Sequence, residues 1–120
     1  MMHQQQRTDA TRTEVVDMAQ AIIDGRIDLI EGCRRLGSLA HAAGWQDDEV
    51  FLPIRAVDSE TDRFPPTHAR QHYSRRLLEQ LDRERGEYVR WAQPHVVSAC
   101  RAIVEKLSRQ RLAGGAPADG

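Results

Sequence analysis

Apolar residues recur three and four positions apart in the first part of the chain, a period that indicates amphipathic helices. A first helix is predicted at residues 12–24, because Thr11 and Glu14 have capping-box spacing and Gly25 can end a helix in the left-handed conformation. Residues 1–10 are polar and aperiodic, so we expect a disordered tail there. The apolar face of this helix consists of Val15, Ala19, Ile22 and Ile23.

A second helix is predicted after a short link. Asp28 can accept a backbone hydrogen bond as its N-cap, and Gly44 is placed to end it. The two helices should form an antiparallel pair, because the link between them is short. The apolar face of the second helix consists of Leu29, Ile30, Cys33, Leu36, Leu39 and Ala40.

Prolines shape the middle of the chain. Between residues 45 and 62 apolar residues recur every three positions, while Pro53 has no amide hydrogen to donate inside a helix. This pattern predicts a third helix with Pro53 in its first turn. The sequence Phe64-Pro65-Pro66 predicts an extended connection, and Thr67 is expected to cap a short turn that reaches Tyr73. The recurring apolar residues of the third helix are Phe51, Ile54 and Val57.

The last third of the chain predicts one long helix or a helix pair. Ser74 is a suitable cap for its start, and Pro94 either kinks the helix or starts a new one. The stretch from Asp82 to Glu87 is polar on all sides and should project into solvent. Residues 113–120 are expected to be a disordered tail. The apolar positions are Leu77, Leu78, Leu81, Tyr88 and Trp91 before the proline, and Val96, Ala99, Cys100, Ile103, Val104 and Leu107 after it.

The sequence predicts an all-α fold, because no segment shows the period-two alternation of a half-buried strand. A length of 120 residues is enough for one core. We expect a single helical domain at residues 11–112, a compact bundle of four to five helices with a long kinked carboxy-terminal helix or helix pair. Trp45, Tyr73 and Trp91 are interpreted as packing anchors rather than stacking platforms.

Composition narrows the class of protein. With 40% hydrophobic and 29% charged residues, the chain is typical of a globular domain rather than a disordered one. No apolar run reaches the roughly 18 residues of a membrane span, and the start lacks the apolar stretch of a signal peptide, so we expect a soluble cytoplasmic protein. Cys33 and Cys100 lie within apolar helical patterns and are expected to be buried, reduced thiols.

Charge is distributed unevenly along the chain. Residues 1–62 carry six arginines and twelve acids, a balance of −6, whereas residues 63–111 carry ten arginines and Lys106 against five acids, a balance of +6. Either the two halves pack together, or the basic half binds nucleic acid, or a charged face docks to another protein. Acids alternate with arginines between Glu79 and Arg90, so nucleic acid is not the expected partner.

One pair of residues has metal-ligand spacing. His68 and His72 are four apart, so on an α-helix they would share a face, and the acids of residues 58–62 could complete a site. However, the glutamate that follows the first histidine of a zinc-protease helix is missing, and Arg70 places a cation between the two. The sequence also has no nucleophile elbow and no glycine-rich phosphate loop. We therefore expect no catalytic residue, no cofactor and no metal.

An acidic run from Asp58 to Asp62 precedes the proline-rich connection. It lacks the alternating ligands and central glycine of a calcium loop. It can be a solvated helix end, a structural partner of Arg63 or Arg70, or a surface that meets another protein. The candidate interaction surface consists of Asp58, Glu60, Asp62 and Arg70.

Four segments of the chain, residues 28–36, 58–62, 66–70 and 82–85, carry patterns that resemble a bacterial family of small helical proteins of unknown function. The resemblance extends over residues 15–107. It implies an all-helical fold and directs attention to the acidic run and Arg70. Some members of the family carry an amino-terminal membrane helix, which this sequence does not show, and the resemblance implies no catalytic residue.

These observations favour a non-enzymatic protein-binding module, of which an immunity or antitoxin-like inhibitor is one concrete form. We expect its partner to be another protein rather than a membrane or a nucleic acid, and a homo-oligomer stays open. One alternative is a metal-dependent enzyme that uses His68 and His72 with nearby carboxylates. The other is a nucleic-acid binder that uses the arginine-rich half.

Overall fold

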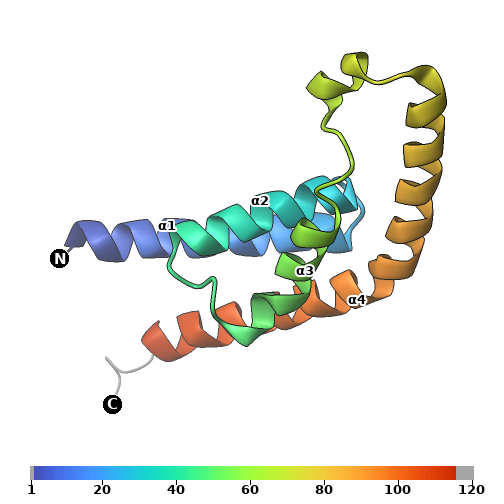
Figure 1. The fold of residues 1–120 in the computed structure, drawn as a ribbon. Coiled ribbons are helices and arrows are strands. Elements are labelled where there is room, and N and C mark those ends of the chain that lie inside the picture. The colour runs from blue at the N-terminus through green and yellow to red at the C-terminus, as the bar shows by residue number, and fades with distance from the viewer. Residues whose placement is uncertain (1, 116–120) are drawn as a thin grey trace.

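The computed structural model describes residues 2–115, and every regular element within them is a helix (Figure 1). Side chains are described for residues 9–110. The predicted all-α class and the four to five helices are confirmed. No helix within residues 2–115 is both long and apolar enough to cross a membrane. The elements are α1 (Met2–Ile23), α2 (Leu29–Ala42), the 3₁₀ helix η1 (Glu49–Phe51), α3 (Leu52–Glu60), the 3₁₀ helix η2 (Thr67–His72) and α4 (Arg75–Gly115).

Helix α1 begins at Met2, ten residues before the predicted start. The hydroxyl of Thr13 donates to the backbone oxygen of Asp9 at 3.1 Å, a bond within a continuing helix rather than a cap. Residues 2–10 contain no glycine or proline, so nothing in them ends the helix. These residues, expected to be a disordered tail, are therefore helical. At the other end of the chain, α4 continues to Gly115, and residues 116–120 lie outside the described residues.

The link between α1 and α2 forms as its sequence predicts. Gly25 has a φ of +69°, the left-handed conformation that ends a helix, and the amide of Arg26 donates back to the oxygen of Ala21 at 2.9 Å. The side chain of Asp28 accepts the amide of Glu31 at 3.0 Å and caps α2. Gly44, with a φ of +78°, follows the end of α2. Local signals therefore define both ends of this hairpin turn and of α2.

The prolines of the middle segment lie where the sequence predicts, but the helix cap expected at Thr67 does not form. Pro53 is in the first turn of α3, where a helix amide needs no partner. Pro66 is extended, with φ −66° and ψ 160°, and it occupies the cap position of η2. The expected cap by Thr67 is therefore wrong, because η2 begins at Thr67 itself and no side chain caps it.

Helix α4 changes direction along its length (Figure 1). Ser74 accepts the amide of Leu77 at 3.1 Å, as expected for a cap. Pro94 lies inside the helix and kinks it rather than ending it, because a proline ring removes one backbone bond and crowds the preceding turn. Residues 75–90, here called the arm, stand away from the other helices, and the remainder of α4 lies along α1.

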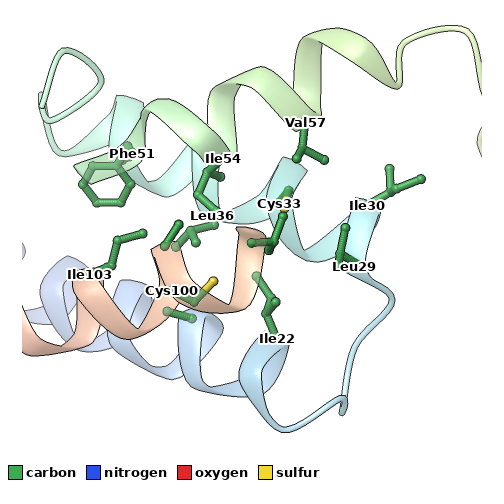
Figure 2. Packing of buried hydrophobic residues seen from close by; sticks show 14 of the residues in the cluster. Ile22, Leu29, Ile30, Cys33, Leu36, Phe51, Ile54, Val57, Cys100 and Ile103 are labelled. Atoms are coloured by element: carbon green, nitrogen blue, oxygen red, sulfur yellow. The ribbon is translucent and has the colours of Figure 1, made fainter. Parts of the chain in front are cut away.

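One core joins α1, α2, α3 and the second part of α4 (Figure 2). All predicted apolar positions of the first three helices are buried or half-buried, and so are those of α4 after Pro94. The predicted apolar positions before Pro94 are less completely covered. Leu77 on the arm is 40% exposed, and Trp91, just after the arm, is 62% exposed. The fully buried side chains of largest volume are Phe51, Ile30, Leu36, Ile54, Ile103, Val15 and Val96.

Candidate functional site at the base of the arm

The acidic run surrounds the end of α3, and its carboxylates have different neighbours. An oxygen of Asp58 lies 4.0 Å from Nε of Arg34 on α2. Glu60 accepts a hydrogen bond from the Tyr88 hydroxyl of the arm at 2.6 Å. Asp62 is exposed in the turn that follows α3. The three carboxylates of the predicted interaction surface therefore do not converge on one ligand position.

Arg70, the fourth residue of that surface, pairs with the arm rather than with the acidic run. Its two terminal nitrogens donate to both oxygens of Asp82, at 2.7 and 2.8 Å. Arg63 likewise donates to Glu84 of the arm at 2.8 Å. Of the three alternatives for the acidic run, the one in which it pairs with Arg63 or Arg70 is therefore wrong, because the arm returns alongside this segment and offers its own carboxylates. The bonds from Arg70 hold the pKa of Asp82 below its ordinary value.

A second ion pair joins the arm to the start of α2. A terminal nitrogen of Arg85 lies 2.5 Å from the Asp28 carboxylate, which also caps α2. Burial acts to raise the pKa of Asp28, but the bonds from Arg85 and from the Glu31 amide outweigh burial and lower it. Sequence order did not indicate this contact, because the two residues are 57 positions apart. Asp28 was expected only as a helix cap, and Arg85 lies in a stretch that was expected to project into solvent.

Arg34 connects α2 to the turn that follows α3. Its side chain is 27% exposed, and its Nη2 donates to the backbone oxygens of Thr61 at 2.9 Å and Phe64 at 3.5 Å. Thr61 is fully buried, and its hydroxyl donates to the oxygen of Val57 at 2.6 Å. Arg34 thus adds a charged donor to the turn after α3, where the oxygen of Thr61 also accepts the amide of Phe64 at 3.0 Å.

The residues of the two ion pairs, together with Arg34, line a pocket of about 820 Å³ at the base of the arm. Glu31 and Arg34 line it from α2, Pro65 from the connection, and Arg85 from the arm. The pocket mixes cations with carboxylates that already bond one another, and its lining holds no hydroxyl or thiol nucleophile bonded to a base within the described side chains. The arrangement is suited to fixing the position of the arm.

The histidine pair lies on η2, which is a 3₁₀ helix rather than an α-helix. With three residues per turn, positions four apart are offset by a third of a turn, so His68 and His72 do not share a face as expected for an α-helix. Both are exposed. Among the described residues no group of three His, Cys, Asp or Glu side chains is placed to hold a metal ion.

The two cysteines are free and buried, as the sequence predicts. Burial raises the pKa of each thiol to about 12. The nucleophilic form of cysteine is the thiolate, so at neutral pH both side chains act as apolar packing groups. Cys33 comes from α2 and Cys100 from α4, and both belong to the core in Figure 2.

From the end of the arm onward, three aromatic rings follow one another along α4. The ring centroids of Tyr88 and Trp91 are 5.8 Å apart, and those of Trp91 and His95 are 5.3 Å apart, all tilted. We call Tyr88, Trp91 and His95 the aromatic strip. The interpretation of Trp91 as a packing anchor is wrong, because this side chain is 62% exposed. Helical spacing identified it as apolar but could not show that no other element covers it.

Comparison with known proteins gives one match. Residues 1–103 match the model of a family described as "Protein of unknown function (DUF2489)", a range that includes the acidic run, the arm and the aromatic strip. The resemblance to a family of unknown function is thereby confirmed. No curated protein and no solved structure matches the chain.

Proposed function

Because the chain belongs to the family of proteins of unknown function DUF2489, we propose its function from its surface, as a non-enzymatic protein-binding module that docks its partner on the aromatic strip. The observation that carries this proposal is the 62% exposure of Trp91 between two other rings. Tryptophan and tyrosine are enriched among the residues that contribute most to binding at protein interfaces. Contacts with Tyr88 and His95 restrict the indole ring before binding, which reduces the entropy lost on association.

Polar groups next to the aromatic strip also support its proposed role in binding a protein. Glu60 accepts the hydroxyl of Tyr88, and the guanidinium of Arg63 lies 4.6 Å from the ring centre of Phe64, which neighbours Tyr88. An exposed apolar ring with charged residues around the neighbouring Tyr88 fits the anatomy of an interface, with an apolar centre and a polar rim. In this proposal Glu60 and Asp62 belong to the rim, while Asp58 and Arg70 fix the positions of α3 and the arm.

The partner in this proposal is another protein, and an inhibitor of the immunity or antitoxin kind is one module of this type. Such an inhibitor covers a surface of its target and needs no catalytic group of its own. Two free, buried thiols fit a reducing compartment, so we place the module in the cytoplasm.

The test compares Trp91 with Leu52, a matched exposed apolar residue that is 51% exposed at the start of α3. A photo-crosslinking amino acid at each position, expressed in native host cells, should capture a partner at position 91 and not at position 52. With that partner purified, Trp91→Ala should weaken binding by about tenfold or more, and Leu52→Ala should leave it unchanged. Trp91→Ala should lower the free energy of unfolding by about 1 kcal/mol or less, because the residue is exposed.

The proposal fails if position 91 captures no protein that position 52 does not. It also fails if the purified partner binds Trp91→Ala and the unchanged chain equally well.

A further inference from the structure

A groove of about 990 Å³ runs between α1 and α2 on the side of the hairpin away from α3 and α4. No residue of α3 or α4 lines it, and Figure 1 shows these two helices packed on the other side of the pair. Its apolar residues are only half-buried within one chain. They are Met18, Ala21, Ile27 and Leu39.

The two walls of the groove carry opposite charge. On the α1 side, Glu14 and Asp17 are both exposed acids. The opposite wall, formed by the link and α2, carries three guanidinium groups and one carboxylate. Its charged residues are Arg26, Arg34, Arg35 and Glu31. Counted over the lining residues alone, the walls have formal charges of −2 and +2 on either side of the apolar floor. Within the chain, Arg26 also pairs with Asp24 and Arg34 lies near Asp58, so Arg35 is the basic residue best placed to meet a partner.

We infer that this groove is the interface between two copies of the chain, paired so that α1 of each copy lies on α2 of the other. A two-fold axis that lies in the plane of the interface and runs along the groove brings the same patch of both copies face to face and exchanges the left and right walls. The acidic wall of one copy then faces the basic wall of its partner, on both sides of the axis at once. The half-buried residues of the two floors meet between them and lose their remaining contact with water.

Charge complementarity is the reason for choosing a second copy as the occupant. The groove has an acidic wall on α1 and a basic wall on α2, so opposite charges meet when α1 of one copy packs on α2 of the other. Like charges would meet if the copies packed α1 on α1. Arg35 is 58% exposed although its Nε bonds Glu31 of the same helix, so its side chain can also reach a partner. The inference goes beyond the proposed function and does not depend on it, because the aromatic strip lies on α4.

The experiment reverses one charge on each wall. Asp17→Arg and Arg35→Asp are examined separately and as an equimolar mixture by sedimentation equilibrium, with Arg101→Asp on exposed α4 surface as the control. In either single variant, like charges meet twice in the dimer, so dimerisation should weaken about tenfold or more. In the mixture every Arg faces an Asp again, so a heterodimer of near-original affinity should form. The control should dimerise like the unchanged chain.

Recovery in the mixture separates an intermolecular pair from damage to the fold, because a misfolded variant would not be rescued by another. The inference is overturned if the unchanged chain sediments as a monomer up to about 1 mM, or if the single variants dimerise normally. It is also overturned if the mixture remains as weak as its two components, since α1 then does not face α2 of the partner.

Discussion

Arg34 and Arg35 are neighbours in the sequence, yet their surroundings give them different roles. Arg34 is 27% exposed and donates to backbone oxygens of the turn after α3, whereas Arg35 is 58% exposed and bonds Glu31 one helical turn away. The half-buried guanidinium of Arg34 adds a charged donor to the oxygen of Thr61, which also accepts the amide of Phe64, and hydrogen bonds from charged groups contribute more than neutral ones. The ion pair between Arg35 and Glu31 is exposed to water, so it contributes little to the free energy of unfolding.

This contrast predicts different costs for the two truncations. Arg34→Ala should lower the free energy of unfolding by about 1.5 to 3 kcal/mol, because it leaves the oxygens of Thr61 and Phe64 without their charged donor. Arg35→Ala should lower it by about 0.5 kcal/mol or less. Urea denaturation followed by circular dichroism measures both. Equal losses in the two variants would show that Arg34 does not hold the turn.

At the scale of elements, the packing of α1 on α2 depends on Gly32, a glycine that lies inside a helix rather than at a helix end. Gly32 lies in the first part of α2, where a Cβ atom would approach Cγ1 of buried Ile22 to 2.6 Å and Cγ2 of Ile27 to 3.1 Å. Ile22 is buried between the two helices and has little room to move, whereas Ile27 is half-buried in the link. The absence of a side chain at Gly32 thus sets how closely α1 and α2 approach.

Gly32→Ala should therefore lower the free energy of unfolding by about 1 to 3 kcal/mol through overpacking. Gly37→Ala on the same helix is the matched control, because the nearest atom to its added Cβ is an oxygen of Asp58 at 3.9 Å. Removing a flexible glycine from a helix should raise stability there by about 0.5 to 1 kcal/mol. Thermal and urea denaturation of the two variants should give opposite signs, and a stabilised Gly32→Ala would contradict the close approach.

At the scale of the whole molecule, polar contacts join the arm to the bundle together with a few apolar ones, in which Leu81, Tyr88 and Val89 pack against the core. Arg85 pairs with Asp28 of α2, the hydroxyl of Tyr88 donates to Glu60 of α3, and Arg63 pairs with Glu84. Leu77, by contrast, is 40% exposed on the arm. Exposed ion pairs are individually weak and are screened by salt, so the position of the arm should respond to ionic conditions more than the core does.

We predict that the arm loosens in acid. The pKa of Asp28 lies below its ordinary value of 3.8, so its pairing is complete above 3.8 and is lost as the pH falls through the lower value of the folded state. Spin labels on Arg76→Cys of the arm and Ser38→Cys of α2 report this as a distance distribution. It should be narrow at pH 7 and broad in acid, while circular dichroism shows the helices retained.

Asp28→Asn provides the same test at neutral pH. Asparagine still caps a helix but cannot form the ion pair, so this variant should broaden the distribution at pH 7 without unfolding α2. Arg83→Gln, a neighbouring exposed change on the arm, is the control and should leave the distribution narrow. A narrow distribution in Asp28→Asn would show that the ion pair does not position the arm.

The sequence by itself determined the features that depend on neighbours a few positions away. Gly25, Asp28 and Ser74 mark helix ends correctly, and Pro53 lies in a first turn, because caps and turns are bonds between residues close in the chain. The apolar period likewise identified the buried faces of α1, α2 and α3. The start of α1 was misplaced because residues 2–10 show no apolar period in the sequence, although the helix begins at Met2.

Only the tertiary structure decided which distant groups meet and which apolar faces are covered. Arg70 bonds Asp82 rather than the acidic run, and Arg85 bonds Asp28 across 57 positions, because the kinked α4 returns beside segments far from it in the chain. Helical period marks Trp91 as apolar, but its exposure follows from the direction in which the arm leaves the bundle. Periodicity reports which side of a helix is apolar, whereas contact between elements depends on where the whole chain places them.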